Sequence, residues 1–239
     1  MISESSVLER IKSRGYWEIE IRPINYQKER ISLPKCREII EACQIRLRGW
    51  YYPHIAQHEF GDVFTGNDFV EGLVDAPKHC EVWRMYKSAQ FIHYLNFWED
   101  WIEHEPYGYP SKGNEWPRTR TVKSILMTLY TVTEVFTFAS RLASNKIFDK
   151  TVHISLKLKN NDNRSLIFED SFRILYADYK SKINEIIIAR DVTVEDILAN
   201  SSSLAMDVTV EIFHRFNWLA EDIKNVLKDD QEKFLKGLI

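Results

Sequence analysis

The sequence predicts an α+β fold, with a mainly antiparallel sheet, or two small sheets, packed against two long amphipathic helices. Short segments such as 17–22 alternate apolar and polar residues, which is the period of a half-buried strand. Two long segments, 121–143 and about 204–234, instead repeat apolar residues every three or four positions, as one face of a helix does. Long helices that can cover a sheet favour the α+β class.

The first half of the chain contains two predicted helices and four predicted strands. Residues 4–13 form a short helix, and residues 32–42 form a second one, with Ser32 as N-cap and Pro34 in its first turn. The strands, which are alternating or rich in aromatic residues, are 17–22, 44–52, 80–86 and 90–98. A tight turn at 87–89 joins the last two strands, so we expect a hairpin there.

The second half begins with the central helix 121–143, in which Glu134 interrupts the apolar stripe and is expected on the surface. The strands expected after this helix are 152–158, 165–168 and 185–190. Thr193 and Asp196 are typical of a helix N-terminus, where a side-chain oxygen caps a free backbone N–H. The long helix 204–234 comes last.

The stretch near 102–118, rich in proline and glycine, is the candidate domain boundary. We expect an N-terminal subdomain, residues 1–105, with aromatic-rich strands, and a C-terminal subdomain, residues 118–239, with the two long helices. The sequence contains no flexible Ser/Gly linker, so the two should pack together. One compact domain is the alternative. Residues 53–79, which contain three glycines, are expected to be rich in loops.

Composition excludes some classes of protein. Hydrophobic residues make up 44% of the 239 residues and charged residues 28%, which is ordinary for a globular protein and unlike a disordered one. The formal net charge of -3 argues against binding of duplex DNA through a broad basic surface, although a local basic groove is still compatible with it.

Cysteine usage and hydropathy predict where the protein works. The chain has three cysteines and no CxxC pair, which favours a reducing compartment, so we expect a cytoplasmic protein. No uninterrupted apolar stretch approaches the length of a membrane span, and the first residues lack the apolar core of a signal peptide. We therefore expect a soluble protein without membrane contact.

The first candidate binding site is a stripe of arginine and aromatic side chains. Arg46, Arg48, Trp50 and Tyr52 alternate along one predicted strand and so share a face, and Arg84 lies on another aromatic strand. Exposed aromatic rings beside arginines are a common platform for stacking unpaired bases. The alternative is a sheet face packed under the long helices, because aromatic residues in strands are usually packing residues.

The second candidate is the start of the central helix, where Arg118, Arg120 and Lys123 place three cations near the positive end of the helix dipole. Each such charge is unfavourable by about 0.3–1 kcal/mol at low salt. An anion bound at the free backbone N–H groups would reverse the sign. Pairing with Glu103 or Glu115, or simple solvation, is the alternative.

The third candidate is a metal site. His54 and His58 are four residues apart, so on a helix both imidazoles could reach one divalent metal, with Asp62 as an oxygen ligand. The alternative is a set of solvated loop residues. A nearby acidic group is expected to be a charged, exposed edge; it consists of Glu99, Asp100, Glu103 and Glu105.

Known catalytic signatures are missing: the sequence has no GxxxxGK[ST], GxGxxG, GxSxG or HExxH motif. Together with the aromatic excess, this predicts a non-enzymatic binding or accessory protein that acts in a complex with a protein partner or a second copy. Nucleic acid or another anionic ligand is the candidate contact, and no cofactor is predicted. The alternative function is a metal-dependent hydrolase or nuclease with a divalent metal.

Overall fold

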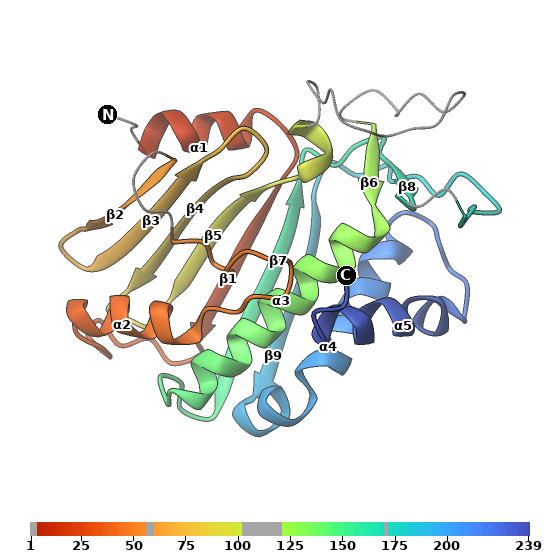
Figure 1. Cartoon of the computed structure of the whole chain (residues 1–239). Helices are drawn as coiled ribbons and strands as arrows, with labels where there is room; N and C mark the ends of the chain where they lie inside the picture. The colour runs from red at the N-terminus through yellow and green to blue at the C-terminus, as the bar shows by residue number, and fades with distance from the viewer. Residues whose placement is uncertain (1–3, 56–59, 102–120, 170–171) are drawn as a thin grey trace.

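The structure is a computed structural model that describes residues 4–55, 60–101, 121–169 and 172–239. It is an α+β protein built on a seven-stranded sheet in the order β2-β3-β4-β5-β1-β7-β9, in which every neighbouring pair is antiparallel (Figure 1). Its strands are β1 (Tyr16–Pro23), β2 (Gly61–Thr65), β3 (Phe69–Asp75), β4 (Cys80–Tyr86), β5 (Phe91–Asn96), β7 (Thr151–Lys159) and β9 (Ile186–Thr193). The predicted fold class is confirmed.

The remaining elements are helices and one small sheet. The helices are α1 (Glu4–Lys12), α2 (Leu33–Cys43), α3 (Ile125–Ser144), α4 (Val194–His214), α5 (Ile223–Leu235) and the short 3-10 helix η1 (Trp98–Trp101). Strands β6 (Val122–Ser124) and β8 (Ser165–Ile167) form a two-stranded parallel sheet. In the part of the chain that the structure describes, no helix has the length and apolar character needed to cross a bilayer.

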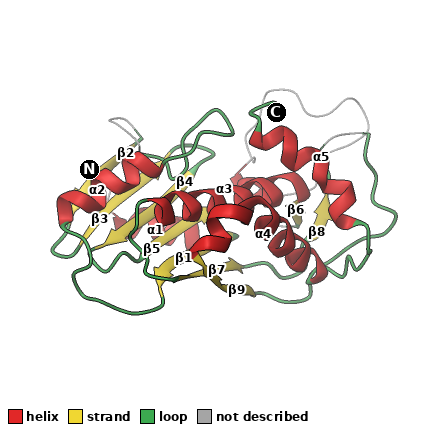
Figure 2. Ribbon diagram, turned by 90° about the horizontal axis from the view of Figure 1, so that it is seen from below, coloured by secondary structure: helices red, strands yellow, loops and turns green. Residues whose placement is uncertain are grey.

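The two long helices α3 and α4 pack together and cover one face of the sheet. Figure 2 shows α3, α4 and α5 gathered on one side of β1, β7 and β9. Alternation along β1 sends Trp17, Ile19 and Ile21 into this main core. Most of α3 is buried, including three threonines and Glu134, because the helix is enclosed by the sheet, α2, α4 and α5.

A smaller core lies on the opposite face, under α1. Cys80 and Val82 alternate with Glu81 and Trp83 along β4, so they point away from the main core and meet Ile11 of α1. Helix α1 contacts β3, β4 and β5 at the upper end of the sheet (Figure 1). Helix α1 thus covers this end of the sheet on the face opposite the main core.

One predicted strand is a loop in the structure. Residues 44–52 were expected to be extended, but Ile45 and Tyr52 form only an isolated antiparallel bridge. Gly49, with a φ of +84°, turns the chain back between them. No neighbouring strand pairs with this segment along its length within the described residues, so alternation alone was not sufficient to make it a strand.

The structure differs from the sequence prediction at two further places. The long helix predicted at 204–234 is two helices, because the chain leaves the helical conformation after α4 and Asn217 adopts a left-handed φ of +66°. The stretch 53–79 was expected to be loop-rich, yet it contributes β2 and β3. Gly72 of β3 lies opposite Trp83, whose indole occupies the space that a side chain would need.

The strands of both predicted subdomains join in one sheet, since β1 pairs with β5 on one side and with β7 on the other. The predicted boundary near 102–118 lies outside the described residues. The division into 1–105 and 118–239 therefore stays a prediction.

Candidate functional site

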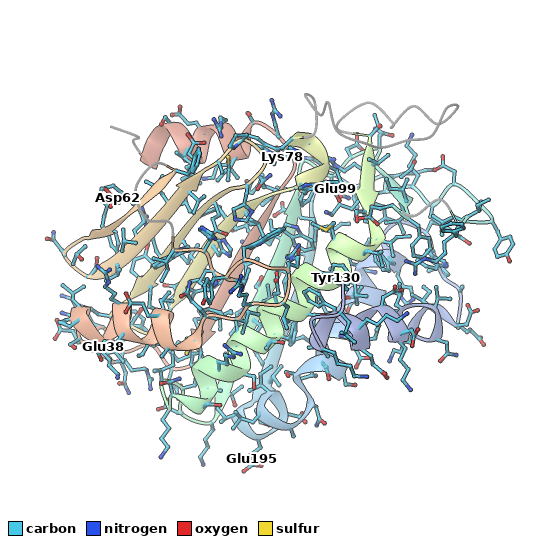
Figure 3. The ribbon with its side chains drawn as sticks, in the orientation of Figure 1. Glu38, Asp62, Lys78, Glu99, Tyr130 and Glu195 are labelled. Atoms are coloured by element: carbon cyan, nitrogen blue, oxygen red, sulfur yellow. The ribbon has the colours of Figure 1, made fainter. Side chains whose placement is uncertain are left out.

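A hollow opens at one end of the main face of the sheet. Its interior cavity has a volume of about 30 Å³, room for one or two water molecules, and it lies between the loop 44–54, the start of β4, η1 and the start of α3. Its lining includes Arg48, Trp50, Tyr52, His79, Glu99 and Lys123. Figure 3 labels two of the lining residues, Lys78 and Glu99, which lie near each other at the upper end of the strands.

The loop 44–54 presents aromatic side chains at the mouth of this hollow. Two backbone hydrogen bonds between Ile45 and Tyr52, of 3.0 and 2.8 Å, close the loop, and both residues are buried. Between these anchors, Trp50 is 40% exposed and Tyr51 is 48% exposed. The buried ends hold the loop, so its tip can keep large rings in contact with water.

Arg48 reaches from the same loop into the protein and forms an ion pair with Glu134 of α3. The Arg48 side chain is 8% exposed and Glu134 is fully buried; Arg48 Nε lies 3.1 Å from both carboxylate oxygens. Arg48 Nη2 also donates to Thr131 Oγ1 at 3.2 Å. The expectation that Glu134 lies on the surface was wrong, because its partner comes from a distant segment.

Glu81 is the centre of a buried polar network at the back of the hollow. Its Oε2 lies 3.1 Å from Nε2 of His93 and 3.2 Å from Nε2 of His79, and its Oε1 accepts the backbone N–H of His54 at 2.6 Å. Burial by itself would raise the pKa of Glu81, but the neighbouring imidazoles of His79 and His93 outweigh burial and hold that pKa well below its usual range. The carboxylate is therefore ionised.

Tyr52 extends this network. Its hydroxyl lies 3.2 Å from Nδ1 of His93, and its ring packs edge-on against Phe138 of α3. Burial, followed by the nearby charges of Glu134 and Glu81, raises the pKa of Tyr52 well above its usual range. The hydroxyl thus keeps its proton and can donate it in a hydrogen bond.

Lys123 and Glu99 form another buried ion pair, with an Nζ to Oε1 distance of 2.9 Å and 1% exposure for each side chain. Glu99 Oε1 also accepts the backbone N–H of Ser124, the N-cap of α3. Burial lowers the pKa of Lys123, while Glu99 acts in the opposite direction. Lys123 itself lies in strand β6, which precedes α3, and not in the first turn of a helix.

Glu99 and Asp100 were expected on an exposed edge, and this expectation was wrong. Both are buried in η1, and Asp100 binds the Arg164 guanidinium with distances of 2.7 and 2.6 Å. Asp100 also accepts the backbone N–H of Gly15 at 2.7 Å. Glu103 and Glu105 lie outside the described residues.

The structure brings four of the predicted binding residues together, since Arg48, Trp50, Tyr52 and Lys123 all line the hollow. Arg46 lies beside it, exposed, with its guanidinium carbon 5.6 Å from the centre of the Tyr51 ring. The other three are not in this group. Arg84 points to the opposite face of the sheet, where it pairs with Glu71, and Arg118 and Arg120 lie outside the described residues.

The predicted metal ligands do not meet in the described part of the chain. His54 is partly buried, and burial lowers its pKa. Asp62 is exposed on the edge strand β2, and Figure 3 shows it apart from Lys78. His58 lies outside the described residues. Among the described histidines, cysteines and carboxylates, no group of three is arranged to hold a metal ion, and the metal alternative stays a prediction.

Sequence reasoning missed His79 and Glu81 as members of this site. One signal could have found them: Glu81 is a carboxylate that shares a strand face with Trp83 and Met85, both apolar. A charge on a face that is otherwise buried needs partners, and histidines nearby in the sequence are candidates.

Comparison of the chain with models of protein families, with curated protein sequences and with solved structures finds no match. The fold and the site therefore define the class by themselves. It is an α+β protein with a seven-stranded antiparallel sheet and a hollow lined by aromatic and paired charged side chains.

Proposed function

We propose that the protein is a binding or accessory protein without enzymatic activity, which holds an anionic ligand with a planar group against the mouth of the hollow. An unpaired nucleotide of single-stranded nucleic acid fits this description. The observation that carries the proposal is that Arg48, Trp50 and Tyr52 of one loop and Lys123 of a distant segment line the same hollow.

The exposed rings supply a stacking surface. Trp50 and Tyr51 keep 40% and 48% of their surface accessible at the tip of a loop whose ends are buried. Stacking of a base on an aromatic side chain contributes about 1–3 kcal/mol to binding and tolerates different bases. A planar ligand would bury this apolar surface.

Cations at the rim support an anionic ligand. The buried arginine and lysine, Arg48 and Lys123, are paired with carboxylates, so they shape the hollow more than they attract a ligand. Arg46 is exposed next to it and can approach a phosphate. Because the whole chain has a net charge of -3, this attraction is local.

A separate surface supports action in a complex. Phe172, Ile174 and Tyr176 alternate along the connection between β8 and β9 and are 94%, 84% and 103% exposed. Clustered exposed apolar side chains mark protein interaction sites, so we include a protein partner or a second copy in the proposal. The free, buried Cys36, Cys43 and Cys80 are consistent with a reducing compartment such as the cytoplasm.

The test is a titration of the protein with labelled single-stranded RNA and DNA oligonucleotides, with a duplex for comparison. We expect single strands to bind better than the duplex, and Trp50→Leu to weaken binding about fivefold or more, because a stacking ring is lost. Tyr26→Leu is the matched control, since Tyr26 is 77% exposed and does not line the hollow. Equal affinity of the wild type and the Trp50 variant would contradict the proposal.

A further inference from the structure

The partners of the buried histidines determine which ring nitrogens carry protons. Glu81 is ionised, so its oxygens can only accept hydrogen bonds. Nε2 of His93 lies 3.1 Å from this carboxylate and must carry a proton towards it. Nδ1 of His93 is then the acceptor for the Tyr52 hydroxyl, 3.2 Å away. Both nitrogens of His93 are thereby satisfied.

His79 faces the same carboxylate. Its Nε2 lies 3.2 Å from Glu81 Oε2 in a poorly aligned contact, so the attraction is mainly electrostatic. An unprotonated Nε2 would turn a lone pair towards the negative charge, and the proton of a neutral His79 therefore sits on Nε2. Nδ1 is left with its lone pair.

The Nδ1 atom of His79 is available to a ligand. The side chain is 29% exposed, lines the hollow, and its ring centre lies 6.1 Å from that of Trp50. Within the described residues, the one polar contact of the His79 ring is that of Nε2 with Glu81. A planar group that stacks on Trp50 would thus have an edge within reach of an acceptor nitrogen.

We propose that His79 determines ligand specificity, with Nδ1 accepting a hydrogen bond from an N–H group on the edge of the planar ligand, such as the exocyclic amino group of an unpaired adenine. This inference rests on the proposed function. Glu81 acts as a positioning residue, because it fixes the ring nitrogen that carries the proton. Ligands without a donor on this edge leave the acceptor unpaired and bind less tightly.

The test uses two probes that differ only in the amino group: a short single-stranded adenosine oligonucleotide and the same oligonucleotide with purine riboside, which has hydrogen in place of the amino group. Binding of the two probes is measured side by side in one buffer. We expect the wild type to bind the adenosine probe about tenfold more tightly, which is the effect of one unpaired polar group. Equal affinity for the two probes would overturn the inference.

Three variants complete the test. His79→Leu, which has no acceptor, should remove the preference, and His79→Gln should restore part of it, because an amide can donate to Glu81 and accept from the ligand. His153→Leu is the matched control: His153 also pairs with a carboxylate, Asp191, at 2.6 Å, but lies outside the hollow and should keep the preference. Circular dichroism shows whether each variant is folded. If a variant does not fold, the affinities of the wild type for the two probes still test the role of the ligand's amino group.

The outcomes separate this inference from the proposed function. The wild type could bind both probes equally, with Trp50→Leu weakening the binding of both. This outcome would leave the hollow as the binding site and remove the role of His79. Absence of binding by any single strand would refute the proposed function, and the inference with it. A preference for the adenosine probe that survives His79→Leu would assign the selection to another residue.

Discussion

Arg48 and Glu134 show how the hollow depends on single charged residues. Both are buried and lie 86 positions apart in the sequence. We expect Glu134→Leu to lower the free energy of unfolding by about 3–5 kcal/mol, because the Arg48 charge loses its partner in a buried place. In the double variant Arg48→Met/Glu134→Leu most of this loss should be recovered, since no charge is left buried.

Urea unfolding of the wild type, both single variants and the double variant measures this coupling. Additive losses in the double variant would show that the two side chains do not depend on each other in the folded protein. Because Arg48 lines the hollow, the same variants also report on ligand binding.

The buried carboxyl group of Glu169 should make the free energy of unfolding depend on pH. Burial, followed by the charge of Glu99, raises its pKa from 4.5 to about 7, although backbone N–H groups and the charge of Lys123 act in the opposite direction. The folded protein therefore holds a proton that the unfolded chain releases at lower pH. Stability from this group is complete below the unfolded pKa and is lost as pH rises through the folded pKa.

The measurement for Glu169 compares wild type and Glu169→Gln by urea unfolding at acidic pH and at about pH 8. We expect similar free energies of unfolding in acid and an advantage of about 3 kcal/mol for the variant at the higher pH, because glutamine has no proton to lose. Other groups, Glu81 among them, contribute to both proteins and cancel in the difference. An advantage that is the same at both pH values would contradict the assignment.

At the scale of elements, the contact between β3 and β4 supports the wall of the hollow. The Trp83 indole lies over Gly72, where a Cβ atom would collide with it, and Trp83 Nε1 donates to the carbonyl of His54 at 2.8 Å. We expect Gly72→Ala to lower the free energy of unfolding by about 1–3 kcal/mol, as overpacking of a core does. Urea unfolding followed by tryptophan fluorescence measures the change, and an unchanged midpoint would show that the indole moves aside at no cost.

At the scale of the whole molecule, one sheet and one main core extend through both halves of the chain. β1 joins β5 to β7, and the main core contains residues from the first strand to the last helix. We therefore expect the predicted subdomains to unfold together. Circular dichroism and tryptophan fluorescence should give coincident transitions in urea, whereas two separated transitions would show that the subdomains are independent.

The sequence by itself determined the fold class and most of the strands and helices. Residues 17–22 and 152–158 alternate because one face of each strand meets the core, and α3 carries apolar residues on every side because the helix is enclosed. These patterns are local and repeat along one element. They can be read without knowledge of which elements become neighbours.

Only the tertiary structure decided which residues form the site. The segment 44–52 alternates like a strand but is a loop, since no strand lies beside it and Gly49 turns the chain. Glu134 and Glu99 interrupt local patterns and resemble surface residues, yet each is buried against a cation from another segment. A buried charge is stable only with its partner, and that partner is determined by contacts between segments distant in the sequence.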